Sequence, residues 1–168
     1  MQAADYLLDK GYKQLAYVSG DAGSMTSDKR WLGFAETVKS REAASPIFIN
    51  SKYSFEAGLE AAKELIEHTS KPDAVFCAND ILAMGVMDGL RQLGFSIPGD
   101  FAVMGVDDIP MASWPSYDLT TIAQPIDKIV QSAVEDLMQR INENTDAEGT
   151  YLLEPGIIIE RGSTALSQ

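Results

Sequence analysis

Short apolar runs alternate with segments of helical periodicity along most of the chain, and this alternation limits the folds open to the sequence. The runs are almost unbroken in their apolar residues. Such runs are typical of strands buried on both faces, whereas strands with one solvated face alternate apolar and polar residues. We therefore predict an α/β fold: a three-layer αβα, doubly wound parallel sheet. Its first four strands lie in QLAYVSG (14–20), PIFIN (46–50), DAVFCA (73–78) and FAVMGV (101–106).

Helical spacing fills the intervals between these runs. Ser54 is a suitable amino-terminal cap, and Gly94 occupies the position after a helix where a left-handed residue is common. Later, YDLTTIAQPI (117–126) reads as a short strand interrupted by Pro125, and YLLEPGIIIERGS (151–163) as a final strand pair or one bent strand. The predicted helices cover about 2–10, 28–39, 54–67, 79–94 and 127–142.

Composition limits the kinds of partner that the chain can bind. A chain of 168 residues suits one domain, and its formal net charge of −12 with scattered Lys and Arg argues against direct nucleic-acid binding. The single Cys77 lies in an apolar run and is expected in the core. No run reaches the roughly 20 residues of a membrane span, and no secretory signal is visible. The chain begins in the middle of a helical pattern without a cap, so we expect a piece of a longer protein.

Polar residues follow the apolar runs, with two adjacent aspartates after the last of them in VMGVDDIP (103–110). In doubly wound sheets, ligands bind in the crevice beyond the carboxyl ends of the strands. Asn79 and Asp107 each follow a strand directly, Arg30 opens a helix at the same edge, and Tyr53 follows residues 46–50. A carboxylate can accept two strong hydrogen bonds from vicinal hydroxyls, and an aromatic face can cover a sugar ring. Together these residues predict a polyol-binding crevice.

Other chemistries are less well supported. Adjacent aspartates point in different directions at a strand end, so Asp107 and Asp108 make a poor acid–base dyad. There is no G-x-S-x-G elbow, no phosphate-binding glycine motif, and the only histidine, His68, is near a helix end. A metal site from Asp80, Asp107 and Asp108 is conceivable, but nothing in the spacing selects it. Purely structural alternatives also exist: a helix cap for Asp80 and a turn-forming role for Asp108.

The stretch from Ala74 to Ile141 resembles the effector-binding domain of lactose-repressor/galactose-repressor (LacI/GalR) type transcription regulators. The shared pattern is a strand, AND, a helix ending in LG, then IPGD, a strand with GVDD, and LTTIAQP before an amphipathic helix. AADYLLDKGYKQLAYVSG (3–20) and DKRWLGF (28–34) extend the resemblance over essentially the whole chain. The resemblance implies one lobe of a periplasmic-binding-protein-like type I fold, the carboxyl-terminal one. It assigns 1–121 and 150–168 to this lobe, and 122–149 to a crossover and helix of the other, mostly absent lobe.

The resemblance also implies a function. The full-length protein would be a cytoplasmic, sugar-responsive regulator, a repressor acting as a homodimer, without catalysis, cofactor, metal or membrane contact. Its operator DNA would be bound by a helix-turn-helix domain missing from this chain. A periplasmic sugar-binding protein for transport is the alternative. The implied ligand contacts are Arg30, Tyr53, Asn79, Asp107 and Gln124, with Trp114 and Asp80 as further candidates.

The predicted helix 127–142 carries one broad apolar stripe, whose partner would lie in the absent lobe. Leaving such a stripe in water is unfavourable. We therefore expect the helix either to fold back on its own lobe or, preferentially, to bury the stripe against a second copy. The stripe consists of Ile126, Ile129, Val130, Ala133, Val134, Leu137, Met138 and Ile141.

Overall fold

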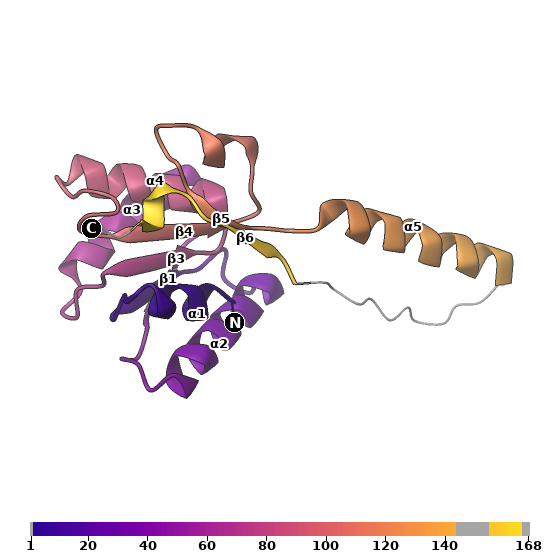
Figure 1. Ribbon diagram of the computed structural model, residues 1–168, viewed down its shortest axis with the longest axis horizontal. Helices are drawn as coiled ribbons and strands as arrows, with labels where there is room; N and C mark the ends of the chain where they lie inside the picture. Colours follow the sequence, from indigo (N-terminus) through magenta and orange to yellow (C-terminus); the bar gives the residue numbers. More distant parts are fainter. Residues whose placement is uncertain (1, 144–154, 166–168) are drawn as a thin grey trace.

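A six-stranded sheet organises the computed structural model, which describes residues 2–143 and 155–165. Helices cover both faces of the sheet, with α1 and α2 on one side and α3 and α4 on the other (Figure 1). The predicted α/β class is therefore confirmed. The elements are α1 (Gln2–Asp9), β1 (Leu15–Val18), α2 (Met25–Ser40), β2 (Ile47–Ile49), α3 (Phe55–Glu67), β3 (Ala74–Cys77), α4 (Asp80–Gln92), β4 (Ala102–Val106), η1 (Pro110–Ser113), β5 (Thr120–Ala123), α5 (Ile126–Glu143), β6 (Ile157–Ile159) and η2 (Gly162–Thr164).

The strand order is β2-β1-β3-β4-β5-β6. The first five strands run parallel, and β6 alone is antiparallel to its neighbour β5. From β1 the chain passes first to β2 on one side and then to β3 on the other, so the order reverses between β1 and β3. Such a switch point opens a crevice at the carboxyl ends of the two strands. Here the residues that follow these strands are Ser19–Gly20 and Ala78–Asn79.

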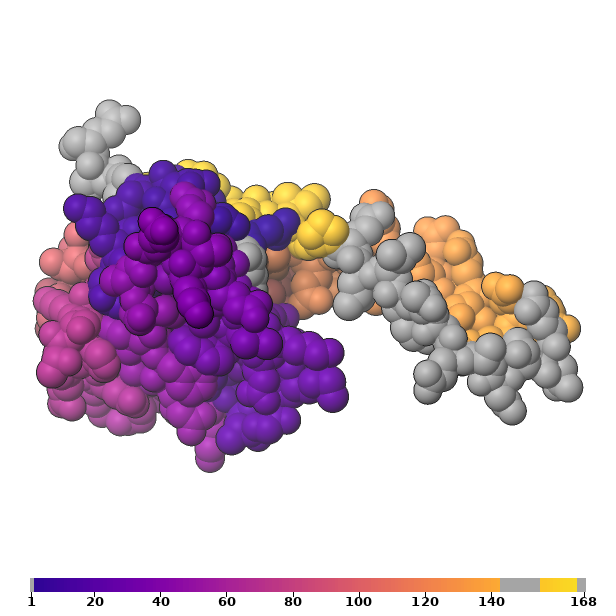
Figure 2. All heavy atoms as spheres, turned by 90° about the horizontal axis from the view of Figure 1, so that it is seen from below, coloured from indigo at the N-terminus to yellow at the C-terminus, as the bar shows by residue number. Residues whose placement is uncertain are grey.

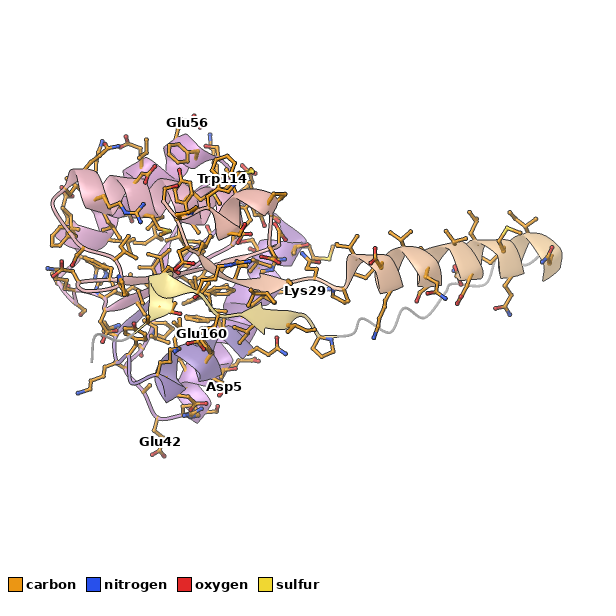
Figure 3. The ribbon with its side chains drawn as sticks, turned by 45° about the horizontal axis from the view of Figure 1, so that its top comes forward. Asp5, Lys29, Glu42, Glu56, Trp114 and Glu160 are labelled. Carbon is orange, nitrogen blue, oxygen red and sulfur yellow. The ribbon has the colours of Figure 1, made fainter. Side chains whose placement is uncertain are left out.

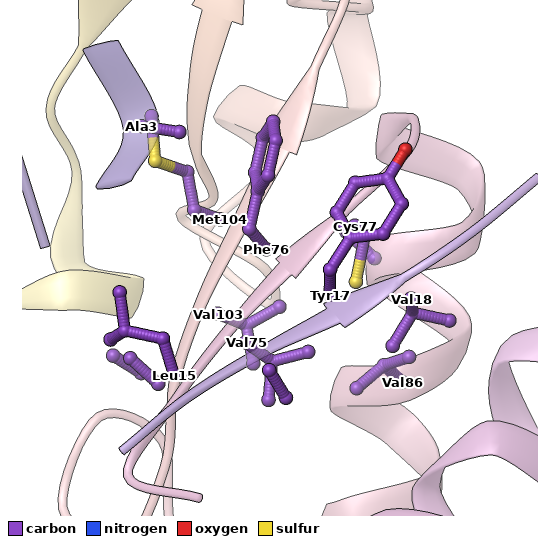
Figure 4. Close-up of a cluster of buried hydrophobic side chains, with 14 of the residues drawn as sticks. Ala3, Leu15, Tyr17, Val18, Val75, Phe76, Cys77, Val86, Val103 and Met104 are labelled. Atoms are coloured by element: carbon purple, nitrogen blue, oxygen red, sulfur yellow. The ribbon is translucent and has the colours of Figure 1, made fainter. Parts of the chain in front are cut away.

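The core lies between the sheet and its two helical layers. Tyr17, Phe76 and Met104 are register partners on neighbouring strands and are fully buried. Figure 4 shows them in one cluster, together with Ala3 from α1. The Tyr17 ring stacks on Trp31 of α2 with centroids 5.8 Å apart. This burial on both faces explains why β1, β3 and β4 read as unbroken apolar runs.

Helices α3 and α4 pack closely because glycines face each other where they cross. A Cβ atom on Gly85 would overlap the carbonyl oxygen of Phe55 and lie 2.9 Å from the Cα atom of Gly58. Any larger side chain at Gly85 would force the helices apart. The contact fixes the amino-terminal half of α4, and therefore the residues that lead into it from β3.

Several predicted boundaries were wrong. Helix α2 begins at Met25 rather than at 28, because Ser24 caps it: the Ser24 hydroxyl accepts a hydrogen bond from the Ser27 amide. Strand β5 ends at Ala123, inside the segment 122–149 that the resemblance assigns to the crossover, and that assignment stays a prediction. The final segment forms a single short strand, β6, in the part that the structure describes; residues 151–154 lie outside it. No helix among the described residues is long and apolar enough to cross a membrane.

Helix α5 projects away from the sheet and its covering helices (Figures 1 and 2). The expectation that it folds back on its own lobe was therefore wrong: in the described part of the chain the helix leaves the sheet directly after β5, and most of its stripe is exposed. Its stripe remains accessible, and contiguous apolar patches on a protein surface often mark places of association. The exposed fractions are 54% for Ile126, Val130 and Val134, 57% for Leu137, 53% for Met138 and 64% for Ile141.

We predict that the isolated chain self-associates through this stripe. Burying each large apolar side chain contributes on the order of 1.5–3 kcal/mol, so the chain should be a dimer or larger by light scattering. Leu137→Glu should shift it to monomer, whereas Ser132→Glu, on the polar side of α5, should not. A monodisperse wild-type monomer with α5 still helical by circular dichroism would contradict the prediction.

Candidate ligand-binding site

Tyr53 lies next to β1 at the carboxyl ends of the parallel strands. Its ring lies so close to Gly20 that a Cβ atom there would overlap it, and its hydroxyl is 3.2 Å from the Ser24 hydroxyl. The Ser27 hydroxyl, next along α2, accepts a hydrogen bond of 2.9 Å from the Gly20 amide. The predicted aromatic residue is therefore held against the carboxyl end of β1. Ser24, which caps α2, and the buried Ser27 were not among the predicted site residues, although Ser is a preferred capping residue.

Arg30 lies on the second turn of α2 and reaches the end of β3. One terminal guanidinium nitrogen donates a hydrogen bond of 2.7 Å to the carbonyl oxygen of Ala78. No partner is found in the described part of the chain for its other nitrogens. Arg30 thus binds the residue before Asn79, and its other nitrogens keep their capacity to donate hydrogen bonds.

Asn79 caps α4, a role that the sequence analysis gave to Asp80 as its structural alternative. The side-chain oxygen of Asn79 accepts a hydrogen bond of 2.9 Å from the Leu82 amide. Its amide nitrogen has no partner among the residues described. The cap therefore fixes Asn79 in one orientation and leaves it a single group, the NH₂ donor, for a ligand.

The turn after β4 carries two aspartates in an unusual backbone conformation. Asp107 has φ 116° and Asp108 has φ 55°, a region of backbone conformation that residues other than glycine rarely adopt. Such conformations cost on the order of 1–3 kcal/mol each and persist only where neighbouring contacts hold them. One Asp107 oxygen accepts a hydrogen bond of 2.7 Å from the Gln124 amide nitrogen, while Asp108 pairs with Arg161 at 2.7 Å. The two carboxylates are thus engaged by different partners, as expected of a poor dyad.

Asp80 lies beneath this turn rather than in the crevice. It is 1% exposed, and its two oxygens accept hydrogen bonds from the Thr121 hydroxyl at 2.6 Å and the Ile109 amide at 2.9 Å. Burial raises the pKa of the Asp80 carboxyl to about 6. We do not place Asp80 among the ligand contacts, because it is buried and each of its oxygens accepts a hydrogen bond inside the protein. The sequence gives no indication that Thr121 and Ile109 bind Asp80, because these residues are far from it in the chain.

Trp114, the alternative aromatic platform, follows η1 and is 53% exposed. Figure 3 labels its side chain, together with those of Glu56 and Lys29. The contact of the Tyr53 ring with Gly20, directly after β1, favours Tyr53 as the aromatic residue of the site. In the described ranges, no three His, Cys, Asp or Glu residues group as a metal site requires.

The sequence-predicted residues otherwise occupy successive positions along one edge. Tyr53 lies at β1, Arg30 and Asn79 at β3, Asp107 at β4 and Gln124 after β5, and these strands are consecutive neighbours in the sheet. Neighbouring strands are about 4.8 Å apart, so the row spans roughly 14 Å. That width accommodates one small molecule lined by a carboxylate, a guanidinium, two amides and a phenol ring.

The raised pKa of Asp80 predicts a pH-dependent stability. The Asp80 carboxyl has a pKa of about 6 in the folded protein, against its ordinary value of 3.8. Its protonation therefore stabilises the fold fully below about pH 4, and this contribution is lost as the pH rises through 6. The amide side chain of the Asp80→Asn variant cannot ionise. The free energy of unfolding of this variant, relative to that of wild type, should therefore rise by about 2–3 kcal/mol between pH 4 and pH 7. Urea titrations across this range measure the difference. Asp100→Asn should run parallel to wild type between pH 4 and pH 7, because the Ser96 amide and hydroxyl lower the pKa of Asp100 and its contribution is lost only below about pH 4. Parallel curves for wild type and Asp80→Asn would refute the assignment.

Comparison with known proteins places this chain in a family. Residues 4–164 match the periplasmic binding protein-like domain. The ribose operon repressor of Escherichia coli (strain K12) is 35% identical over 163 residues, which cover 96% of this chain and 49% of the repressor. The HTH-type transcriptional repressor PurR of Vibrio vulnificus is 32% identical, over 94% of this chain and 48% of that protein. The chain thus spans about half the length of these relatives.

A solved structure adds a ligand to the comparison. A LacI family transcriptional regulator from Enterococcus faecium with bound ribose superposes with a TM-score of 0.87 at 30% identity, covering 99% of this chain and 62% of that one. The fold, the sheet-edge motifs and these relatives agree. The chain belongs to the periplasmic binding protein-like domain family, in the form found as the effector-binding domain of LacI/GalR transcription regulators.

Proposed function

We propose that this chain is the carboxyl-terminal lobe of the effector-sensing domain of a sugar-responsive transcription regulator. The observation that carries the proposal is the row of Tyr53, Arg30, Asn79, Asp107 and Gln124 along one sheet edge at the switch point. Such an edge is where doubly wound folds bind small molecules. The other half of the crevice would come from an amino-terminal lobe outside this chain, with residues beyond Ala123 crossing into it.

Asp107 would grip the sugar hydroxyls. One of its oxygens is held by Gln124, and the other has no partner in the described ranges, so it can accept from a hydroxyl group. Arg30 and the Asn79 amide would donate to hydroxyl or ring oxygens, and the Tyr53 ring would cover an apolar face of the sugar. Donors and acceptors in this combination suit a neutral polyol better than an anion, which would meet the Asp107 carboxylate.

Ribose is the sugar that we propose first. A relative at 35% identity is named for the ribose operon, and a structural neighbour at 30% identity contains ribose. The named relatives are repressors, and we propose a repressor without catalytic activity that works in the cytoplasm as a homodimer. A periplasmic sugar-binding protein for transport is the less favoured alternative, because the two named relatives are both regulators.

The signal would pass through the crossover. Gln124 follows β5 and precedes α5 by a single proline, and its side chain binds Asp107 directly. A ligand that competes for Asp107 or adds to this contact would favour one arrangement of the two lobes over another. Ligand binding would then shift the population of closed lobes and alter DNA affinity elsewhere in the full-length protein.

We predict that Asp107→Ala weakens D-ribose binding by the intact natural protein 30-fold or more in isothermal titration calorimetry. Removing one partner of a buried charged hydrogen bond costs roughly 2–5 kcal/mol. Asp73→Asn is the matched control, since Asp73 accepts from the Lys13 and Gln14 amides at the opposite edge of the sheet and should leave affinity unchanged. Equal ribose affinity in wild type and Asp107→Ala would overturn the site assignment.

A second prediction concerns DNA. With a net charge of −12, the isolated chain should not retard operator DNA in gel-shift assays, even at low salt. The intact natural protein should do so, and D-ribose should change that affinity. Specific, salt-sensitive retardation by the isolated chain would contradict the proposal.

A further inference from the structure

Asp107, whose carboxylate we propose to bind the ligand, lies on a turn with a strained backbone. Asp107 and Asp108 both have positive φ values, and neither is a glycine. Backbone of this kind relaxes unless surrounding contacts hold it in place. The side chain of Asp107 has a fixed direction only while this turn is maintained, so the contacts that hold the turn also determine the geometry of the site.

Asp80 supplies the most buried of these contacts. It accepts from the Ile109 amide at the end of the turn, and from the Thr121 hydroxyl on β5. The same Thr121 oxygen accepts from the Asp108 amide at 3.4 Å. One side chain at the start of α4 therefore fixes the turn after β4 at two points, directly through Ile109 and indirectly through Thr121.

Gly105 gives independent support for a built-in contact. A Cβ atom at this position of β4 would overlap a carboxylate oxygen of Asp80 and lie 3.2 Å from its Cα atom. The strand therefore leaves space for the carboxylate to pass under the turn. The ion pair of Asp108 with Arg161 holds the turn from outside, but its side chains are 28% and 16% exposed and are more open to solvent screening.

We propose that Asp80 is a positioning residue for ligand binding, which holds the turn 107–109 so that Asp107 faces the crevice. This inference rests on the proposed ligand site at Asp107 and deepens it. Asp80 itself touches no ligand, because it is buried with both oxygens bonded within the protein.

The contact requires the shape and hydrogen-bonding capacity of the side chain rather than its charge. The Thr121 hydroxyl can either donate or accept, so an amide at position 80 can donate to it and still accept from the Ile109 amide. Asp107 and Asp108 on the turn and Cys77 on β3 are the titratable groups that interact with Asp80. Since the two aspartates disfavour a further negative charge beneath them, Asp80→Asn should preserve the turn.

The experiment compares Asp80→Ala with Asp80→Asn and with Asp100→Ala. Asp100 is the matched control, because it accepts from the amide and hydroxyl of Ser96 near the opposite end of β4. Backbone amide hydrogen exchange at residues 107–109, without ligand, reports the turn, and calorimetry with D-ribose on the intact natural protein reports affinity. Asp80→Ala should accelerate exchange there and weaken ribose binding by about 10-fold or more, a loss of about 1.4 kcal/mol. Asp80→Asn should stay within about 3-fold of wild type, and Asp100→Ala should match wild type.

If Asp80→Ala does not fold, Thr121→Val provides the same test, because it removes only the hydroxyl that links Asp80 to the Asp108 amide. Unchanged exchange at 107–109 in these variants would overturn the inference. Equal losses of affinity in Asp80→Ala and Asp80→Asn would overturn it too. If wild type binds no D-ribose but amide exchange at 107–109 is still faster in Asp80→Ala than in wild type, the positioning role stands and the proposed ribose function fails.

Discussion

The parallel alignment of β1, β3, β4 and β5 is the constraint on which the rest of the structure depends. Parallel strands end at one edge, so residues that lie far apart in the chain meet there without further folding. Tyr53, Arg30, Asn79, Asp107 and Gln124 come from five separate segments, and each reaches this edge through its own strand or helix. The helices that return the chain also bury the sheet on both faces, which makes the edge the natural place for polar residues.

The sequence predicted most of the fold because continuous burial leaves a direct record in β1, β3 and β4. It also predicted which residues follow the strands, and five of its seven candidates lie along the edge. It failed at Asp80 and at the start of α2. At Asn79–Asp80 two residues could each have capped α4, and only the tertiary contacts with Thr121 and Ile109 decide between them. Arg161, which pairs with Asp108 from the far end of the chain, had no local signal for the same reason.

The site is built in layers of decreasing exposure. Asp107 keeps one oxygen without a partner in the described ranges, the Asp107–Asp108 turn carries this side chain, and the buried Asp80 binds the end of the turn through the Ile109 amide. Burial of a carboxylate is unfavourable, as the raised pKa of Asp80 indicates, so the fold gives up stability to keep this group in place. Strain and buried charge at one point are typical of a site whose geometry matters to function. Helix α5 continues from the same edge, so the turn adjoins the segment that would join the two lobes.

The most direct test of this account is a crystal structure of the intact natural protein grown with D-ribose. The account predicts one ribose at the carboxyl ends of β1, β3 and β4, with its hydroxyl groups within hydrogen-bond distance of Asp107 and Arg30 and its ring against Tyr53. Ribose bound elsewhere, or at this edge with Asp107 making no contact to it, would contradict the central claim.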